Sequence, residues 1–273
     1  MSLITTLLPS RRICLSIFAL ATAISAQAQT YNAGADLLAN EKPDDPTDSA
    51  NPNFTVPQWS YGYRALTADV SLTLFTTADH EDNVSGGVFD GFSDAAGSPC
   101  CGRLPSLHVN TGPVAGFPQG SVGTGELVLH PDGAAGGNFA LEQKVVVRFT
   151  APTAGSYAVS ALWEDINDCC GTNNNPNPGV DVHVVINGVS VFDDAISREE
   201  GAIDPLGLPT ATSFSSPAIN LSGGDTVDFV VGTNGQLFGD ATRFNATLTV
   251  PEPSTAILLG LSGAGLLARR RRA

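Results

Sequence analysis

The sequence has 273 residues, of which 29 are Gly and 18 are Pro, a share of helix-breaking residues above the usual level of roughly 12%. Long helical bundles are therefore disfavoured. With 42% hydrophobic and 15% charged residues, the chain has enough apolar material for a core and too little charge for a disordered acidic tail. Residues 29–253 hold all 27 acidic residues but only seven of the 13 basic ones, a formal net charge of −20. Because phosphate backbones are bound through Lys and Arg, this balance argues against nucleic-acid binding.

Residues 1–28 have the pattern of a secretory signal peptide. Two arginines precede Ile13–Ile24, an apolar run that is too short to anchor the chain across a bilayer. Ala26-Gln27-Ala28 follows and fits the small-x-small rule for cleavage. We therefore expect cleavage after Ala28, export by the general secretory route, and Gln29 as the first mature residue.

The body of the chain has the pattern of strands. Residues 29–58 are rich in Asp, Asn, Pro and Ala and show little periodicity, so they are expected to form an irregular leader. From Trp59 onward, short apolar alternations are separated by turn residues, and no segment keeps a 3.6-residue period. The pattern predicts one domain over 59–250, and its clearest strands are Val70–Phe75, Glu126–His130, Lys144–Phe149, Ser156–Trp163, Val180–Ile186, Val189–Phe192, Thr226–Val231 and Phe244–Val250.

The clearest local element is a hairpin. Apolar residues alternate along Val180–Ile186, Asn187-Gly188 supplies the favoured type I′ turn, and Val189–Phe192 returns antiparallel. Strands with one apolar and one polar face, joined without crossover helices, are typical of antiparallel sheets. The predicted fold class is all-β, an antiparallel β-sandwich of the jelly-roll kind.

Two identical Cys-Cys-Gly triplets lie in segments rich in Pro, Gly and Asn. They contain Cys100 and Cys101 in the first triplet and Cys169 and Cys170 in the second. Export makes disulfides the expected state, and bonds between the triplets are favoured over strained vicinal bonds. Three pairings are open, and the sequence does not choose among them. The alternative is a four-thiolate zinc site, which usually needs a wider C-x₂₋₄-C spacing.

Aromatic residues offer a candidate ligand surface. Trp59, Tyr61 and Tyr63 alternate, so an extended strand would place their rings on one face, where sugars could stack. Trp163 is a further candidate near the second triplet. The alternative for all four is a place in the core, as is usual for large aromatic side chains.

The sequence lacks the usual short catalytic motifs. It has no Gly-x-Ser-x-Gly elbow, no H-E-x-x-H and no phosphate-binding Gly loop, so an enzyme is not predicted. A glycan-cleaving enzyme stays as an alternative, because the separation of two catalytic carboxylates is a property of the folded chain.

The C-terminus has three parts in sequence. Pro251-Glu252-Pro253 precedes the apolar run 254–268, and Arg269, Arg270, Arg271 and Arg272 follow. This order resembles the PEP-CTERM sorting signal of Gram-negative bacteria. The resemblance implies a tail helix that halts in the inner membrane, with the arginines on the inside, and cleavage by an exosortase. The alternative is a plain C-terminal anchor.

A second resemblance covers residues 59–250 and is clearest from 144 onward. It rests on Arg148–Tyr157, Val182–Phe192 and Leu221–Phe229. These segments resemble the jelly-roll domain of PEP-CTERM proteins, which is similar in plan to galactose-binding-like and carbohydrate-binding modules. Such modules often hold a structural calcium, and the resemblance places Asp240 near a ligand position.

Acidic residues in the segments between strands suit calcium, which takes six to eight oxygen ligands. The alternative is solvated acidic loops. If disulfides join the two triplets, the same edge of the sandwich is expected to gather an acidic rim. The candidate ligands are Asp90, Asp94, Asp165, Asp168 and Asp240.

The sequence thus predicts an exported, non-catalytic protein of the cell envelope, cell surface or extracellular matrix. Its predicted role is to bind polysaccharide in a biofilm context. The alternative is a purely structural surface protein that associates with itself or with other matrix proteins. Buried Trp59 and Tyr61 would favour the alternative, whereas exposed rings beside a groove would favour sugar binding.

Overall fold

The structure is a computed structural model, and it describes most of the body of the chain. The described residues are 28–40, 55–65, 71–75, 77–78, 82–84, 86–93, 105–117, 120–132, 143–166, 179–197, 209–234 and 240–251. They belong to one compact unit, Ala28–Pro251. The predicted signal peptide and tail lie outside the described residues.

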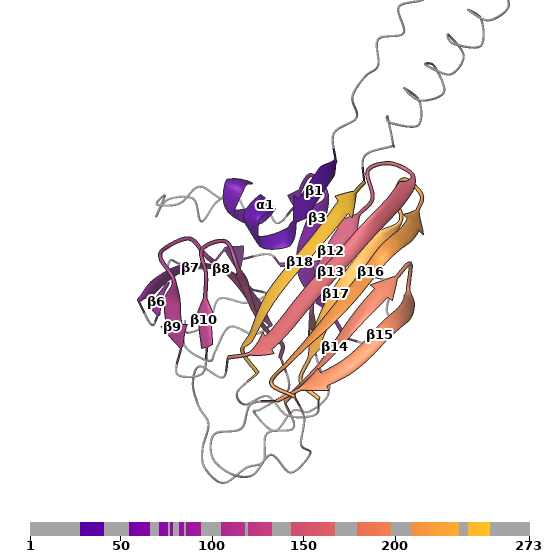
Figure 1. Ribbon diagram of the computed structural model, residues 1–273. Coiled ribbons are helices and arrows are strands. Elements are labelled where there is room, and N and C mark those ends of the chain that lie inside the picture. Colours follow the sequence, from indigo (N-terminus) through magenta and orange to yellow (C-terminus); the bar gives the residue numbers. More distant parts are fainter. Residues whose placement is uncertain are drawn as a thin grey trace, which may run out of the picture. The chain divides into compact units, whose positions relative to one another are not determined.

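Two large antiparallel sheets, one two-stranded hairpin and one short helix make up the described fold (Figure 1). The first sheet contains β1 (Gln29–Asn32), β5 (Thr77–Ala78), β6 (Asp82–Val84), β7 (Gly87–Ser93), β8 (Ser106–Asn110), β11 (Leu127–His130), β13 (Gly155–Asp165), β16 (Ala211–Leu221) and β18 (Thr242–Val250). The second contains β2 (Thr55–Val56), β3 (Trp59–Arg64), β4 (Thr73–Leu74), β12 (Lys144–Thr150), β14 (Val180–Ile186), β15 (Val189–Ile196) and β17 (Thr226–Gly232). A small hairpin is formed by β9 (Ala115–Phe117) and β10 (Gly120–Val122), and the helix is α1 (Ala33–Asn40).

The strand connections confirm the predicted fold class. From β11 onward the chain passes back and forth between the sheets: β12, β14, β15 and β17 lie in the second sheet, and β11, β13, β16 and β18 in the first. All pairings are antiparallel. This is a β-sandwich with jelly-roll-like connections.

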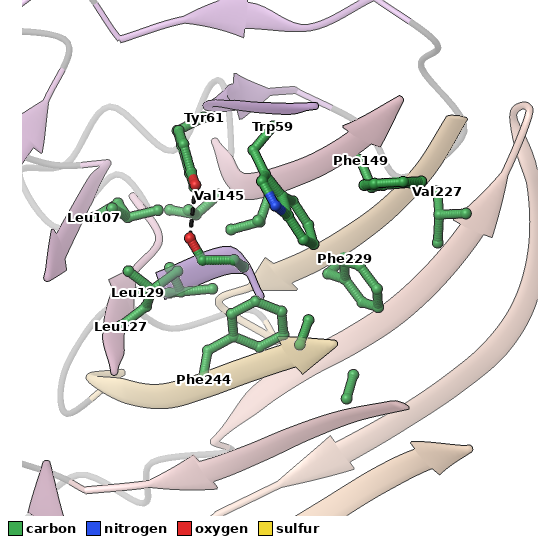
Figure 2. Packing of buried hydrophobic residues seen from close by; sticks show 14 of the residues in the cluster. Trp59, Tyr61, Leu107, Leu127, Leu129, Val145, Phe149, Val227, Phe229 and Phe244 are labelled. Carbon is green, nitrogen blue, oxygen red and sulfur yellow. Dashed lines mark hydrogen bonds between the residues drawn. The ribbon is translucent and has the colours of Figure 1, made fainter. Parts of the chain in front are cut away.

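The core lies between the sheets because the inner side chains alternate along each strand. In β13 the buried residues recur at every second position from Tyr157 to Asp165. Aromatic rings fill the centre: Trp59 lies 5.3 Å from Phe149 and 6.4 Å from Phe229, centroid to centroid. Figure 2 shows these rings directed into the space between the sheets, together with Phe244.

The predicted hairpin is present. Asn187 and Gly188 both have positive φ, 49° and 83°, as a type I′ turn requires. The Asn187 side chain also accepts a hydrogen bond from the backbone N–H of Thr226 at 2.8 Å. The turn therefore joins β14 to β15 and contacts the start of β17.

The prediction of an irregular leader over 29–58 is wrong at its start. β1 pairs with β18, from Gln29 opposite Val250 to Asn32 opposite Thr247. α1 then buries Ala33 and Leu37, which are 0% and 1% exposed. We call residues 29–40 the N-terminal arm, and its buried residues belong to the main core.

Asn32 starts the helix, because its side chain accepts the Ala35 N–H and its own N–H donates to the Asp36 carboxylate. The same carboxylate accepts the Trp59 indole N–H at 2.9 Å. The Tyr61 hydroxyl donates to the Ala33 carbonyl at 2.7 Å, the dashed line in Figure 2. These two bonds fix the arm to β3.

The two ends of the sandwich differ. Short turns at 57–58, 151–154, 187–188 and 222–225 lie at one end, with Gln29 and Val250 beside them; we call it the turn end. The opposite strand ends form the far end and flank 66–70, 94–104, 133–142, 167–178, 198–208 and 235–239. Among the described residues, no helix is long and apolar enough to cross a membrane.

Candidate functional site

Three of the four candidate sugar-stacking residues belong to the core. Trp59, Tyr61 and Trp163 are at most 1% exposed, so their rings have no face open to a ligand. Trp163 stacks on Phe192 at 5.9 Å, with 14° between the ring planes. For these three residues the sugar-platform interpretation is contradicted, because the alternation that aligned the rings also directs them inward.

Tyr63 is the partly buried member of the stripe. Its ring lies 5.9 Å from that of Phe75 and packs against the edge of the core. The Tyr61 hydroxyl is fully engaged by the N-terminal arm. Burial, with the nearby Asp36 carboxylate, raises the pKa of Tyr61 well above its usual value, so the hydroxyl stays protonated and donates to Ala33.

A polar array lies on the outer face of the first sheet. Asn32, Thr247, Ser160 and Ser215 pair in one row across β1, β18, β13 and β16. Residues that pair directly share a face, and Tyr31, Leu248 and Val159 face the core between them. The array, which we call the polar face, consists of Thr30, Asn32, Ser160, Ser213, Ser215, Asn245, Thr247 and Thr249. Leu162 lies in the row of Asn245 and Ser213, and the next row holds the Arg243–Glu164 ion pair.

The polar face is uncharged and bonded within itself. The Asn32 amide donates to Asn245 at 3.0 Å and to Thr247 at 3.3 Å, and the Thr30 and Thr249 hydroxyls lie 3.3 Å apart. Ser160 and Ser215 are exposed. Uncharged hydroxyl and amide groups side by side on a sheet can exchange hydrogen bonds with a neutral polar ligand.

The acidic residues do not gather as one rim. Asp90 lies on β7 and Asp165 on β13, and the strands β8, β11 and β18 lie between them in the sheet. Four strand spacings, about 19 Å, therefore separate the two strands. The expected grouping of Asp90 with Asp165 is therefore wrong. Asp94 and Asp168 lie outside the described residues.

Asp165 and Asp240 do lie close together. Asp165 pairs with Thr242, and the Ile166 N–H donates to the Ala241 carbonyl at 3.0 Å. Both carboxylates are 0% exposed, at the far end of the core. Within the described part of the chain no three His, Cys, Asp or Glu side chains form a group that could hold a metal ion. The two residues alone supply fewer oxygens than calcium takes.

The four cysteines also lie outside the described residues. The strand ends that flank both triplets, Ser93 and Ser106 on one side and Ile166 and Gly179 on the other, lie at the far end. Disulfide bonds between the triplets remain a prediction that this topology permits.

The outer face of the second sheet carries an ionic cluster that the sequence did not reveal. The Asp228 carboxylate accepts hydrogen bonds from Arg148 Nε at 2.6 Å and Nη2 at 2.8 Å. It also accepts a hydrogen bond from Arg64 Nη1 at 2.8 Å. The side chains of Arg64 and Asp228 are 1% and 2% exposed. The hydrogen bonds to Asp228 raise the pKa of Arg148 above its usual value, although burial of the guanidinium acts to lower it.

The reason for this burial is a second apolar layer. Val146, Val185 and Val230 are at most 1% exposed on the outer face, and Leu72 packs against them. Alternation alone assigns Arg148 and Asp228 to a solvated face. No signal in the sequence reports that Leu72 packs on that face.

A second cluster connects β12, β14 and β15. His183 bridges two carboxylates, with Nε2 2.5 Å from Asp181 and Nδ1 2.5 Å from Asp193, while Lys144 Nζ lies 2.5 Å from Asp181. Burial acts to lower the pKa of His183, but its hydrogen bonds to the two carboxylates outweigh burial and raise it. Both ring nitrogens donate only in the imidazolium, so the cluster favours charged His183.

The pKa of Asp181 is shifted in the opposite direction, downward. Burial acts to raise its pKa, yet the hydrogen bond from His183 and the charge of Lys144 hold it well below the usual range. The backbone N–H of Asn234 also donates to this carboxylate at 3.0 Å. The cluster therefore links β14 to the edge strand β15 and to the end of β17.

Comparison with known proteins identifies the tail. Residues 249–272 match the PEP-CTERM protein-sorting motif. The motif marks an exported protein that is sorted to the cell envelope, and it implies processing by an exosortase. Its first two residues, Thr249 and Val250, are also the last two of β18. No curated protein matches the chain.

Several solved structures resemble parts of the sandwich. The GH26-CBM35 β-(1,4)-mannanase of Podospora anserina is 17% identical, with a TM-score of 0.28 over 50% of this chain and 24% of the mannanase. A family 35 carbohydrate-binding module from Clostridium thermocellum is 16% identical, with a TM-score of 0.23 over 49% and 81%.

A third resemblance is to the carbohydrate-binding module CBM36 in complex with calcium and xylotriose, which is 14% identical, with a TM-score of 0.23 over 50% and 89%. Because these TM-scores are low, the β-sandwich architecture is assigned from the strand pairing of this chain and not from these resemblances.

Proposed function

We propose that the chain is an exported, non-catalytic envelope protein whose sandwich binds a neutral polysaccharide. The observation that supports binding is the polar face, where exposed and partly exposed Ser, Thr and Asn side chains form an uncharged array beside the Arg243–Glu164 ion pair, on a strongly acidic body. Sugar hydroxyls both donate and accept hydrogen bonds, so such a surface suits them without charge pairing. The sorting motif supports an encounter with extracellular polysaccharide, such as that of a biofilm.

A glycan array tests the proposal, together with affinity electrophoresis on the exopolysaccharide of the host. Ser160→Glu places a carboxylate in the middle of the polar face and should weaken retention at least tenfold. Thr73→Glu is the matched control, because Thr73 is exposed on β4 of the other sheet. Absence of retention on any glycan, or equal loss in both variants, would contradict the proposal.

A structural role is the second candidate, and a specific observation favours it. Trp59, Tyr61 and Trp163 serve the core, so the described residues present no aromatic platform of the kind that sugar-binding surfaces commonly use. In this alternative the sandwich is a rigid surface module that associates with copies of itself or with other matrix proteins. Light scattering over a range of concentrations distinguishes it, because self-association without glycan retention would favour the structural role.

Calcium enters the proposal as a structural ion at the far end. Asp165 and Asp240 are both fully buried in neighbouring strand ends, and a divalent cation there would offset the cost of burying two acidic side chains. Thermal unfolding of the exported domain with calcium and with a chelator tests this. A melting temperature that is identical in both conditions would remove calcium from the proposal.

A further inference from the structure

We propose that the turn end is a membrane-facing surface, which seats against phospholipid headgroups while the C-terminal tail is still attached. The tail continues from β18 at this end. The apolar run begins at Ser254, four residues after Val250, and four residues span at most about 14 Å. The hydrocarbon core of a bilayer that holds the tail therefore begins within that distance of Val250, and the headgroup layer takes up about 5–8 Å of it, so the turn end stays close to the headgroups.

The charge of the turn end fits such a partner. Among residues 57–58, 151–154, 187–188 and 222–225, with Ala28, Gln29, Val250 and Pro251, the one charged side chain is Asp225. Its carboxylate accepts the Ser222 N–H at 2.7 Å. Residues 29–253 carry a net charge of −20, and bilayers with anionic lipids repel acidic surfaces. The described end that must approach the membrane is thus nearly free of negative charge.

The far end shows the opposite composition. Its strand ends carry Arg64, Lys144, Asp165, Asp181 and Asp240. Arg64, Lys144, Asp165 and Asp240 are at most 6% exposed, so these charges lie in the interior of the far end. What bears on the membrane is therefore the scarcity of charge at the turn end itself.

The turn end is also rigid and partly apolar. Ala151 N–H donates to the Asp225 carbonyl and Gly224 N–H to the Ala151 carbonyl, both at 2.8 Å, so two neighbouring turns are bonded to each other. Val189, directly after the hairpin turn, is 65% exposed. Exposed prolines at 57, 152 and 251 add further uncharged surface. Because these turns are already held by hydrogen bonds, contact with headgroups would not require a loop to become ordered.

The test uses the full chain, with its tail intact, reconstituted in vesicles of phosphatidylcholine and phosphatidylglycerol that carry a headgroup spin label. Val189→Trp places a fluorophore at the turn end. Thr210→Trp is the matched control, because Thr210 is exposed and its carbonyl accepts the Asp165 N–H at 3.0 Å, which places it at the far end. The native Trp59 and Trp163 are at most 1% exposed and give the same background in both variants.

We expect the headgroup label to quench the fluorophore at position 189 at least threefold more than the one at position 210. Adding Ala154→Glu should reduce the quenching at position 189 on these vesicles but much less on pure phosphatidylcholine, because the new carboxylate meets anionic lipid only in the first. Cooperative thermal unfolding of each variant confirms that it is folded. Equal quenching at the two positions, or no effect of Ala154→Glu on anionic vesicles, would overturn the proposal.

Discussion

Truncation of Leu37 tests whether the N-terminal arm is part of the core. Leu37 is 1% exposed and packs in the main cluster, whereas its neighbour Leu38 is only partly buried. Removal of a buried Leu side chain costs about 2–5 kcal/mol through lost burial and the cavity left behind. We expect Leu37→Ala to lower the free energy of unfolding by about 3 kcal/mol. For a domain of this size that corresponds to a fall in melting temperature of roughly 6–12 °C.

Leu38→Ala is the matched control on the same helix. Its cost should stay near 1 kcal/mol, because a partly exposed side chain loses less burial. Urea denaturation of the exported domain, under oxidising conditions for all variants, measures both. If residues 29–58 formed an irregular leader, both substitutions would be nearly neutral. Costs below about 0.5 kcal/mol for both would therefore refute the placement of α1 in the core.

Three further predictions concern the ionic clusters and the cysteines. Asp228→Asn leaves two guanidinium groups without their carboxylate and should cost about 3–5 kcal/mol, whereas Asp194→Asn, at an exposed position, should cost under 1 kcal/mol in the same denaturation assay. Because the pKa of His183 is raised on folding, its contribution to stability is complete below its unfolded pKa of about 6.5 and is lost as the pH rises through the folded value. Unfolding free energies measured from pH 6 to 9 should fall by less in His183→Gln, and an unchanged slope would contradict the charged bridge. Peptide mapping of the unreduced protein should find Cys100 and Cys101 bonded to Cys169 and Cys170, and free thiols or vicinal bonds would disprove that prediction.

The sequence predicted most of the strongly alternating strands, but in the described part of the predicted Val70–Phe75 only Thr73–Leu74 is a strand, and β8 and β16 were missed. The valine-rich β12, β14 and β17 have one apolar residue at every second position, and their boundaries agree closely with the prediction. β16 has the sequence ATSFSSPAINL, and its edge position leaves most of its side chains at least partly exposed. Pro217 lies where the register with β13 shifts between Tyr157 and Val159. An edge strand with a bulge tolerates Pro and Ser, so its periodicity is weak.

The candidate site was harder to predict because its members meet through long-range pairing. The four residues of the central row of the polar face come from four strands, and only the register brings them together. The same holds for the contact of Trp59 with Asp36, in which a helix within the supposed leader satisfies the indole N–H. The alternation of Trp59 and Tyr61 was visible in the sequence. Whether that face was inner or outer depended on the position of β3 in the second sheet.

The pairing of β1 with β18 gives a physical reason for the position of the predicted signal cleavage. Cleavage after Ala28 leaves Gln29 as the first residue, and Gln29 is also the first residue of β1, opposite Val250. Cleavage beyond Asn32 would remove Tyr31, which is 4% exposed and lies 5.1 Å from Phe149, and would expose the edge of β18 where the sorting motif begins. The N-terminal arm therefore protects the strand that leads into the tail. Gln29, the predicted first residue after the signal, and Thr249, the first residue of the sorting motif, lie on paired strands because β1 and β18, the first and last described strands, are partners.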